Sequence, residues 1–189
     1  MRFVCDGCFK DDYCVIPYFV LKKWDFSKYS ISIKEKEILE KFYSEPIIKI
    51  KSNDILIQKS SVFKKVLYYK RKIHKIYDIM KCNKAEEFAL NVLKEHKYLV
   101  LLENLFSLKD LMEMEKGIFL DKIKIYFENF EKHIIKECKT CEYKGGYCNN
   151  CNTNEKLFCY QIEIVHLCKI CGNIYHRKCS LVHICNLDS

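Results

Sequence analysis

The stretch that decides the fold lies near the end of the chain, where CKTC (residues 138–141), CNNC (148–151), CKIC (168–171) and YHRKC (175–179) follow one another. A C-x2-C step lets two thiolates from one turn reach the same tetrahedral metal ion, at about 2.3 Å from each sulfur. His176 and Cys179 add an H-x2-C pair, and a single Cys185 follows. So many ligand pairs in so short a segment predict bound zinc.

The same cysteines favour metal binding over disulfide bonds. Disulfide frameworks belong to oxidising compartments. The first residues, MRFVCDGCFKDDYC (1–14), contain neither the apolar region nor the small-residue cleavage site of a secretory leader. Thirteen cysteines without a leader indicate a reducing compartment, the cytosol or the nucleus. We therefore expect structural zinc.

The composition is that of a folded protein with a core. Of the 189 residues, 49% are apolar and 14% are aromatic, and five glycines and two prolines leave little room for flexible linkers. No apolar run is long enough to span a bilayer. The formal net charge of +8 changes once ligand thiolates are deprotonated and zinc is bound. The location of the cations therefore matters more than their total.

Local signals place helices through the middle of the chain. Ser32–Glu35 (SIKE) is a capping box, and its helix should end near Ser44 because the residue before Pro46 disfavours the α region. Ser107–Asp110 caps a short helix that ends before Gly117, a suitable C′ residue.

Further amphipathic spacing begins a helix at Asn83–Glu86 and forms another from Ile118 to about Glu137, which leads into Cys138.

The strongest predicted helix covers Ser61 to Met80. One face carries an apolar stripe at steps of three and four, formed by Val62, Val66, Tyr69, Ile73, Ile76 and Met80. The other face is basic, with Lys64, Lys65, Lys70, Arg71, Lys72, Lys75 and Lys81. Basic faces attract nucleic acid, acidic lipid or an acidic protein surface. A solvated lysine-rich face without a partner is the alternative.

These patterns predict an α-rich fold, in which a helical body is closed by a loop-rich C-terminal module with several zinc ions and the cross-braced connections of PHD and RING fingers. The expected segments are an N-terminal part with a cysteine pair (1–30), the helical body (31–137) and the zinc module (138–189).

Several notable residues are expected to pack rather than to act. Cys14, Cys82 and Cys159 are interpreted as core or packing cysteines. His133 lies on the apolar side of its predicted helix, so packing is favoured over catalysis, and Trp24 is expected to be buried.

At several separated points the chain resembles the Rubicon homology domain, the zinc-binding region of Rubicon-related endolysosomal adaptors. The matching segments are CDGC (5–8), VIP (15–17), WDF (24–26), KY (28–29), FY (42–43), PI (46–47), FSL (106–108), DL (110–111), Gly117, GYCNNC (146–151), LF (157–158), CKIC (168–171) and YHRKC (175–179). Their order and approximate spacing hold over nearly the entire chain, so the resemblance implies one such domain, residues 1–189.

The departures from this family concern ligand positions. Phe9 stands where the family often has His, and Cys159 stands in FCY (158–160), at a place that is not a ligand in the family. The family ends in a C-P-x-C pair, whereas Cys185 is followed by Asn-Leu-Asp. Either Asp188 or His183 supplies the last ligand, or water does. A carboxylate oxygen is an acceptable zinc donor.

With Cys14, Cys82 and Cys159 set aside, we expect three zinc ions held by Cys5, Cys8, Cys138, Cys141, Cys148, Cys151, Cys168, Cys171, His176, Cys179, Cys185 and Asp188.

The order of the pairs from Cys148 onward resembles a PHD-type finger. That resemblance assigns Cys148, Cys151, His176 and Cys179 to one zinc ion. It assigns Cys168, Cys171, Cys185 and Asp188 to the second. The pair Cys138/Cys141 is then left to join Cys5/Cys8, in a third site that would staple the two ends of the chain. A RING-like pairing of Cys138/Cys141 with Cys168/Cys171 remains open.

The expected function is binding rather than catalysis. Sites saturated by protein ligands are typical of structural zinc, because catalytic zinc keeps an open position. The chain contains no nucleophile elbow, phosphate loop or H-E-x-x-H motif. The resemblance implies an adaptor that binds a late-endosomal Rab-type GTPase in its GTP form, in the cytoplasm and peripherally on late endosomes, lysosomes or autophagosomes.

Acidic membrane lipids are a second expected partner, through Lys64–Lys75. Two other classes of function remain as alternatives. One is a RING-like ubiquitin ligase, which also uses cross-braced zinc. The other is a nuclear zinc module that binds nucleic acid through the basic helix, although nucleic acid is not the expected partner.

Overall fold

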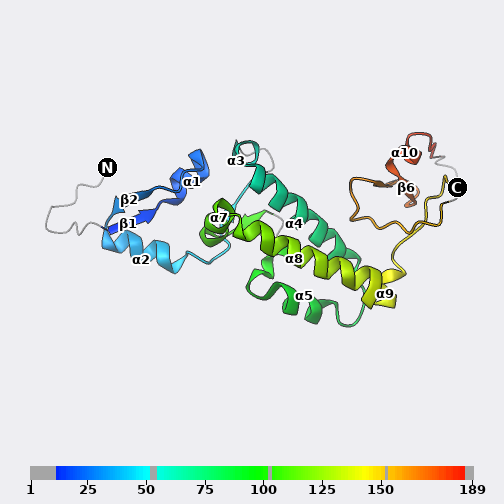
Figure 1. Ribbon diagram of the computed structural model, residues 1–189, viewed down its shortest axis with the longest axis horizontal. Helices are drawn as coiled ribbons and strands as arrows, with labels where there is room; N and C mark the ends of the chain where they lie inside the picture. Colours follow the sequence, from blue (N-terminus) through cyan, green and yellow to red (C-terminus); the bar gives the residue numbers. More distant parts are fainter. Residues whose placement is uncertain (1–11, 52–54, 102–103, 152, 186–189) are drawn as a thin grey trace. The chain divides into compact units, whose positions relative to one another are not determined.

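The computed structural model describes residues 12–51, 55–101, 104–151 and 153–185 (Figure 1). The chain divides into two compact units, the first formed by residues 1–67 and 104–123 and the second by residues 68–103 and 124–189. Helices α4 (Ser61–Ile79) and α8 (Ile118–Lys132) each begin in the first unit and end in the second.

The first unit begins with a hairpin-like pair of strands. β1 (Asp12–Val15) pairs antiparallel with β2 (Lys28–Ile31), and α1 (Pro17–Lys23) connects them. Pro17 occupies a first-turn position of α1, where its fixed φ suits the helix and its missing N–H costs nothing. The helix ends at Trp24, which adopts a left-handed conformation with φ 58°.

The predicted capping box at Ser32 and the predicted helix cap at Ser107 are both confirmed. Before α2 (Ile33–Lys41), the Ser32 hydroxyl accepts a hydrogen bond from the Glu35 N–H, and the Glu35 carboxylate accepts one from the Ser32 N–H. Ser107 and Asp110 form the same reciprocal pair before α7 (Leu108–Glu115). Gly117 then has φ 76°, as expected of a residue that terminates a helix.

The remaining elements of the first unit surround an aromatic core. β3 (Ile48–Lys49) pairs antiparallel with β4 (Leu105–Phe106), and α3 (Ile55–Lys59) precedes α4. The Phe63 ring lies 5.4 Å from the Phe106 ring and 5.8 Å from the Trp24 ring. Phe63 and Phe106 are fully buried, whereas Trp24 is only partly buried, contrary to the expectation of a buried tryptophan.

In the second unit, α4 and α8 pack together with α5 (Ala85–Leu93), as Figure 1 shows in green and yellow-green. The Tyr69 ring on α4 lies 5.5 Å from Phe127 on α8, and Phe88 on α5 lies 5.3 Å from Phe130. Between α5 and α8 the chain passes through η1 (Lys94–His96) and α6 (Tyr98–Leu101).

The predicted apolar stripe of α4 is largely confirmed. Val66, Ile73, Ile76 and Met80 are buried, and Val62 and Tyr69 are partly buried.

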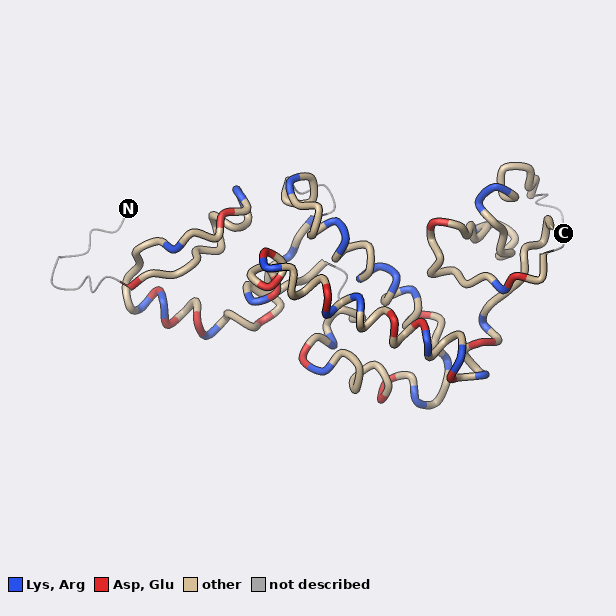
Figure 2. Tube along the Cα trace, in the orientation of Figure 1, with Lys and Arg blue, Asp and Glu red and all other residues tan. Residues whose placement is uncertain are grey.

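The predicted basic face of α4, whose Lys and Arg positions are blue in Figure 2, needs a correction. Lys70 and Lys72, assigned to the exposed face, are 1% and 9% exposed. The Lys72 ammonium lies 4.7 Å from the centre of the Phe127 ring and 3.6 Å from the Glu163 carboxylate. The packed surface around α4 is therefore wider than its apolar stripe, because the helix is covered by more than one neighbour.

A change of helix type leads into the cysteine-rich segment. The predicted single helix from Ile118 to Glu137 is α8 followed by a π-helical turn, η2 (His133–Glu137), which ends at Cys138. In this turn the Cys138 N–H donates to the His133 carbonyl at 3.0 Å, an i to i+5 bond. The short helix α9 (Lys139–Glu142) follows.

The cysteine-rich module has little regular structure of its own. β5 (Val165–Leu167) pairs antiparallel with β6 (Ile174–His176), and α10 (Arg177–Ser180) follows directly. Its core consists of Cys148, Leu157, Val165, Cys168 and Tyr175. A core this small, with cysteines among its members, needs an additional link to be stable.

The expected fold class is confirmed: the described residues are mostly helical, with three two-stranded sheets, and carry a loop-rich module at the C-terminal side. Among the described residues, no helix combines the length and the apolar character needed to cross a bilayer.

Candidate metal centres

Three groups of four side chains in the described residues have the composition of a metal site. Each contains three cysteines and one histidine, and the ligand atoms within each group lie within 4.8 Å of one another.

The first group contains Cys148, Cys151, His176 and Cys179. The Nδ1 atom of His176 lies 3.3 Å from the Cys151 sulfur and 3.9 Å from the Cys179 sulfur. The two CNNC cysteines come from one loop, while His176 ends β6 and Cys179 lies in α10. These are the four residues that the PHD-type order assigns to one zinc ion.

The second group contains Cys168, Cys171, His183 and Cys185. The Cys168 and Cys185 sulfurs are 3.9 Å apart, and the Nε2 atom of His183 lies 3.6 Å from the Cys171 sulfur. The His183 ring also stacks on Tyr175 at 4.3 Å, which fixes its orientation. Among the described residues the fourth member of this group is His183, which the sequence offered as an alternative to Asp188. Asp188 itself lies outside the described residues.

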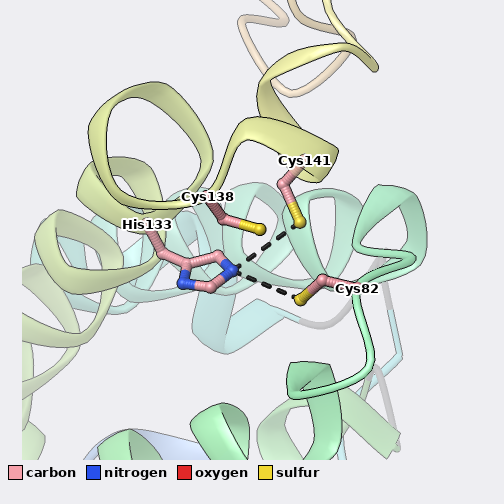
Figure 3. A group of neighbouring side chains, drawn as sticks. All are labelled: Cys82, His133, Cys138 and Cys141. Carbon is pink, nitrogen blue, oxygen red and sulfur yellow. Dashed lines mark hydrogen bonds between the residues drawn. The ribbon is translucent and has the colours of Figure 1, made fainter.

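The third group contains Cys82, His133, Cys138 and Cys141 (Figure 3). The Nε2 atom of His133 lies 3.5 Å from the Cys82 sulfur and 3.6 Å from the Cys141 sulfur. His133 is 8% exposed, and its other face lies against the Phe88 ring at 4.3 Å. It is therefore packed, as predicted, and at the same time aims a ring nitrogen at two sulfurs.

Cys82 and His133 were missed as ligand candidates for a specific reason. Neither has a ligand type three residues away, so neither belongs to a local pair. Cys82, interpreted as a packing residue, faces His133 only because the connection after α4 and the end of α8 meet. The pattern CxxC at Cys138 nevertheless indicated that two more ligands were needed.

The other expected partners of Cys138 and Cys141, Cys5 and Cys8, lie outside the described residues. Cys82 and His133 complete a set of four without them. The alternative RING-like pairing of Cys138/Cys141 with Cys168/Cys171 does not occur, because these two pairs lie in different groups.

From Cys148 onward the connections are cross-braced. The pair Cys148/Cys151 joins His176/Cys179, and the intervening pair Cys168/Cys171 joins His183/Cys185.

The acidity of the thiols is uneven within each group. Burial acts to raise the pKa of Cys148, but backbone N–H groups of His176 and Asn150 outweigh it and lower this pKa to about 6. The backbone N–H groups of Cys171 and Ile170 likewise lower the pKa of Cys168 to about 6.

For three other thiols burial is the largest influence on the pKa. It raises the pKa of Cys179 and that of Cys185 to about 11 each, and that of Cys141 to about 12. Burial also lowers the pKa of His133, which keeps this imidazole neutral and its nitrogen available to a cation.

Donor type and spacing fit zinc. A tetrahedral zinc ion with sulfur at about 2.3 Å and nitrogen at about 2.0 Å holds its ligand atoms about 3.5–3.8 Å apart. The six distances given above run from 3.3 to 3.9 Å, and all ligand atoms within a group lie within 4.8 Å of one another. Each group supplies four protein ligands and leaves no position for a substrate, which is the arrangement of a structural site.

Comparison with known proteins extends these observations. A model of the family described as the Rubicon Homology Domain matches residues 1–187. The chain is 29% identical over 184 residues to human pleckstrin homology domain-containing family M member 3. It is 28% identical over 184 residues to bovine "Protein associated with UVRAG as autophagy enhancer". It is 27% identical over 185 residues to mouse "Run domain Beclin-1-interacting and cysteine-rich domain-containing protein".

Each alignment covers 94% of this chain but only 24%, 27% and 19%, respectively, of the relative. The chain thus spans about a quarter or less of the length of these proteins. Because the family match extends over nearly all of its residues, the chain belongs to the Rubicon Homology Domain family.

Proposed function

We propose that this chain is a zinc-stabilised protein-binding adaptor module that recognises a late-endosomal Rab-type GTPase in its GTP form. The match of residues 1–187 to the Rubicon Homology Domain family carries this proposal. Two relatives have names that refer to autophagy or to Beclin-1, which supports a role in autophagosome and endosome–lysosome traffic.

Zinc is the proposed metal because each group combines thiolates with an imidazole. Soft sulfur donors select zinc over calcium or magnesium, and four protein ligands suit a structural role. When bound, the three ions would link loops that share only a small core. The chain's own residues would then present a fixed binding surface.

Exposed apolar side chains support protein binding in the first unit. Helix α2 buries none of its residues, and Ile33, Ile38 and Phe42 remain exposed. Exposed apolar side chains on a helix are common docking elements. Dependence on GTP requires contact with switch segments that are ordered only when the γ-phosphate is present.

The test is binding of the zinc-loaded chain to a late-endosomal Rab protein that carries either a GTP analogue or GDP. We expect at least about tenfold tighter binding of the GTP form, which corresponds to about 1.4 kcal/mol. Ile38→Asp should weaken the complex, whereas Leu90→Asp, at an exposed position of α5, should not. Equal affinity for both nucleotide states would refute the effector role.

Ubiquitin ligation is a second candidate, because the cross-braced order of ligands from Cys148 to Cys185 is shared with RING fingers. Transfer of ubiquitin from a charged conjugating enzyme, measured with the zinc-loaded chain, separates the two functions. A nucleic-acid role has less support, since Lys70 and Lys72 are buried and the exposed basic face of α4 is smaller than the sequence indicated.

A further inference from the structure

Near its end the cysteine-rich module contains a segment that combines exposed apolar side chains with an absence of acidic residues. No Asp or Glu occurs from Ile164 to Cys185 (Figure 2). Leu181 and Ile184 are each 85% exposed, Val182 is 69% exposed and Ile170 is 61% exposed. Single exposed apolar residues are common, but a group of large ones marks an interaction site.

Three of these four residues are direct sequence neighbours of ligands in one metal group, and Leu181 precedes Val182; we call the four side chains the apolar tip. Ile170 directly precedes Cys171, while Val182 and Ile184 flank His183. Cys171 and His183 belong to the same group, with the Cys171 sulfur 3.6 Å from the His183 Nε2 atom. The residues beside these ligands must therefore lie around the same short rim.

The segment that carries the tip is held at both ends. Leu181 follows α10, which contains Cys179 of the first group, and Ile184 precedes Cys185 of the second group. In between, the His183 ring stacks on Tyr175. With both groups loaded, the apolar side chains are exposed on a restrained backbone, which reduces the entropy lost when they are buried by a partner.

Two cations stand beside the tip. Lys169 lies between Cys168 and Cys171, and Lys178 directly precedes Cys179. Both are exposed, and neither forms an ion pair with a residue that the structure describes. A loaded group of three thiolates, one imidazole and Zn²⁺ carries one net negative charge, which is spread over the sulfurs around the ion, whereas Lys169 and Lys178 are exposed cations.

We propose that the apolar tip inserts into the surface of an anionic lipid bilayer, with Lys169 and Lys178 at the level of the headgroups. Apolar side chains flanked by cations suit the boundary between acyl chains and acidic headgroups. Within the segment from Ile164 to Cys185 no carboxylate repels such a surface; the next acidic residue along the chain is Asp188. Insertion of the tip requires loaded metal groups but does not depend on binding of a GTPase.

The test is sedimentation of the zinc-loaded chain with vesicles of phosphatidylcholine alone or mixed with phosphatidylserine. We expect binding to the mixed vesicles. The variant L181S/V182S/I184S should bind at least about tenfold more weakly, equivalent to about 1.4 kcal/mol. The matched control is L90S/L101S/I125S, which alters exposed apolar residues on helices of the second unit and should retain its binding.

Tryptophan fluorescence provides a second measurement, in which insertion produces a signal and most of the tip is retained. The chain has a single tryptophan, Trp24, so wild-type protein provides the background for L181W. On vesicles that contain brominated lipid, the additional emission of L181W should be quenched and shifted to shorter wavelength. The absence of both changes would overturn the proposal, and so would equal vesicle binding by the triple variant and wild type.

The outcomes also separate this surface from others. K169E/K178E should weaken binding to the mixed vesicles, whereas an effect confined to charge reversal on α4 would refute insertion by the tip. A chain that remains in solution with every vesicle would also refute it and would favour a protein partner for these side chains. If the wild-type chain binds the mixed vesicles but binds no Rab-type GTPase, the proposed effector role is refuted and insertion of the tip is not.

Discussion

The Nε2 atom of His133 lies 3.5 Å from the Cys82 sulfur, although 51 positions separate the two residues in the chain (Figure 3). Cys82 follows α4, and His133 begins the π-helical turn after α8. A metal ion bound between them would therefore tie the ends of two long helices together, beside the start of the cysteine-rich module.

Replacement of either residue should remove one metal ion. We expect about three zinc ions per wild-type chain and about two in Cys82→Ser or His133→Ala, because a tetrahedral structural site with only three remaining protein ligands binds zinc more weakly. Metal analysis of the purified proteins measures this number. Cys159→Ala serves as the control, since Cys159 belongs to none of the three groups.

The pair Cys5/Cys8 tests the other possible partners of Cys138 and Cys141. If Cys138 and Cys141 share their ion with Cys82 and His133, then C5S/C8S should leave that site loaded. Loss of one zinc ion from C5S/C8S, with normal loading of Cys82→Ser, would instead establish the end-to-end staple that the sequence suggested.

The fourth ligand of the second group can be tested in the same way. His183→Ala should lose or markedly weaken one zinc site, because His183 Nε2 faces the Cys171 sulfur at 3.6 Å. Asp188→Ala should retain it. Competition with a chromogenic chelator compares the affinities, and the opposite ranking of the two variants would assign the position to Asp188.

Metal removal should affect the module more than the helices. Cys168→Ser, or treatment with a strong chelator, should unfold the segment from about residue 144 to 185, since Cys148 and Cys168 form part of its small core. Hydrogen exchange should show this loss of protection, while α4, α5 and α8 remain protected by their own packing. Cys159→Ala should cost only about 1–2 kcal/mol of unfolding free energy, so equal damage from both substitutions would contradict the ligand assignment.

Lys72 is expected to contribute to stability through its position over aromatic rings. Its ammonium lies 5.0 Å from the Tyr68 ring centre, 4.7 Å from Phe127 and 5.9 Å from Tyr160, and it donates a hydrogen bond to the Tyr68 hydroxyl. Lys72→Met retains most of the packing but loses the charge, and should cost about 1–2 kcal/mol. Lys75→Met, at an exposed position of the same helix, should change the unfolding free energy by less than about 0.5 kcal/mol. Thermal or denaturant unfolding measures both, and equal stability of the two variants would exclude a role for the Lys72 ammonium.

The exposed cations of α4 give a further prediction. Lys64, Lys65, Arg71 and Lys75 remain exposed, and each would contribute about 1 kcal/mol near an anionic bilayer. Reversal of three of them, in K64E/K65E/K75E, should weaken binding to acidic vesicles and leave the melting temperature nearly unchanged, because exposed charges contribute little to folding. Unchanged vesicle binding would identify these residues as a solvated face.

The amino-acid sequence by itself determined the features that depend on a few neighbouring residues. The capping boxes at Ser32 and Ser107 and the positive φ at Gly117 follow from local hydrogen bonds and local sterics, which a short window contains in full. The CxxC pairs are equally local, because three residues of spacing are enough to bring two sulfurs to one point.

Only the tertiary structure decided which distant groups meet. Cys82 and His133 have no local partner, and the turn of the chain after α4 is set by packing of α5 and α8 rather than by any short pattern. The spacing of apolar residues along α4 predicted which side of the helix is buried, but not how much of the helix surface its neighbours cover. Lys70 and Lys72 are consequently buried, because long side chains can turn their ammonium groups toward rings and a carboxylate from segments far away in sequence.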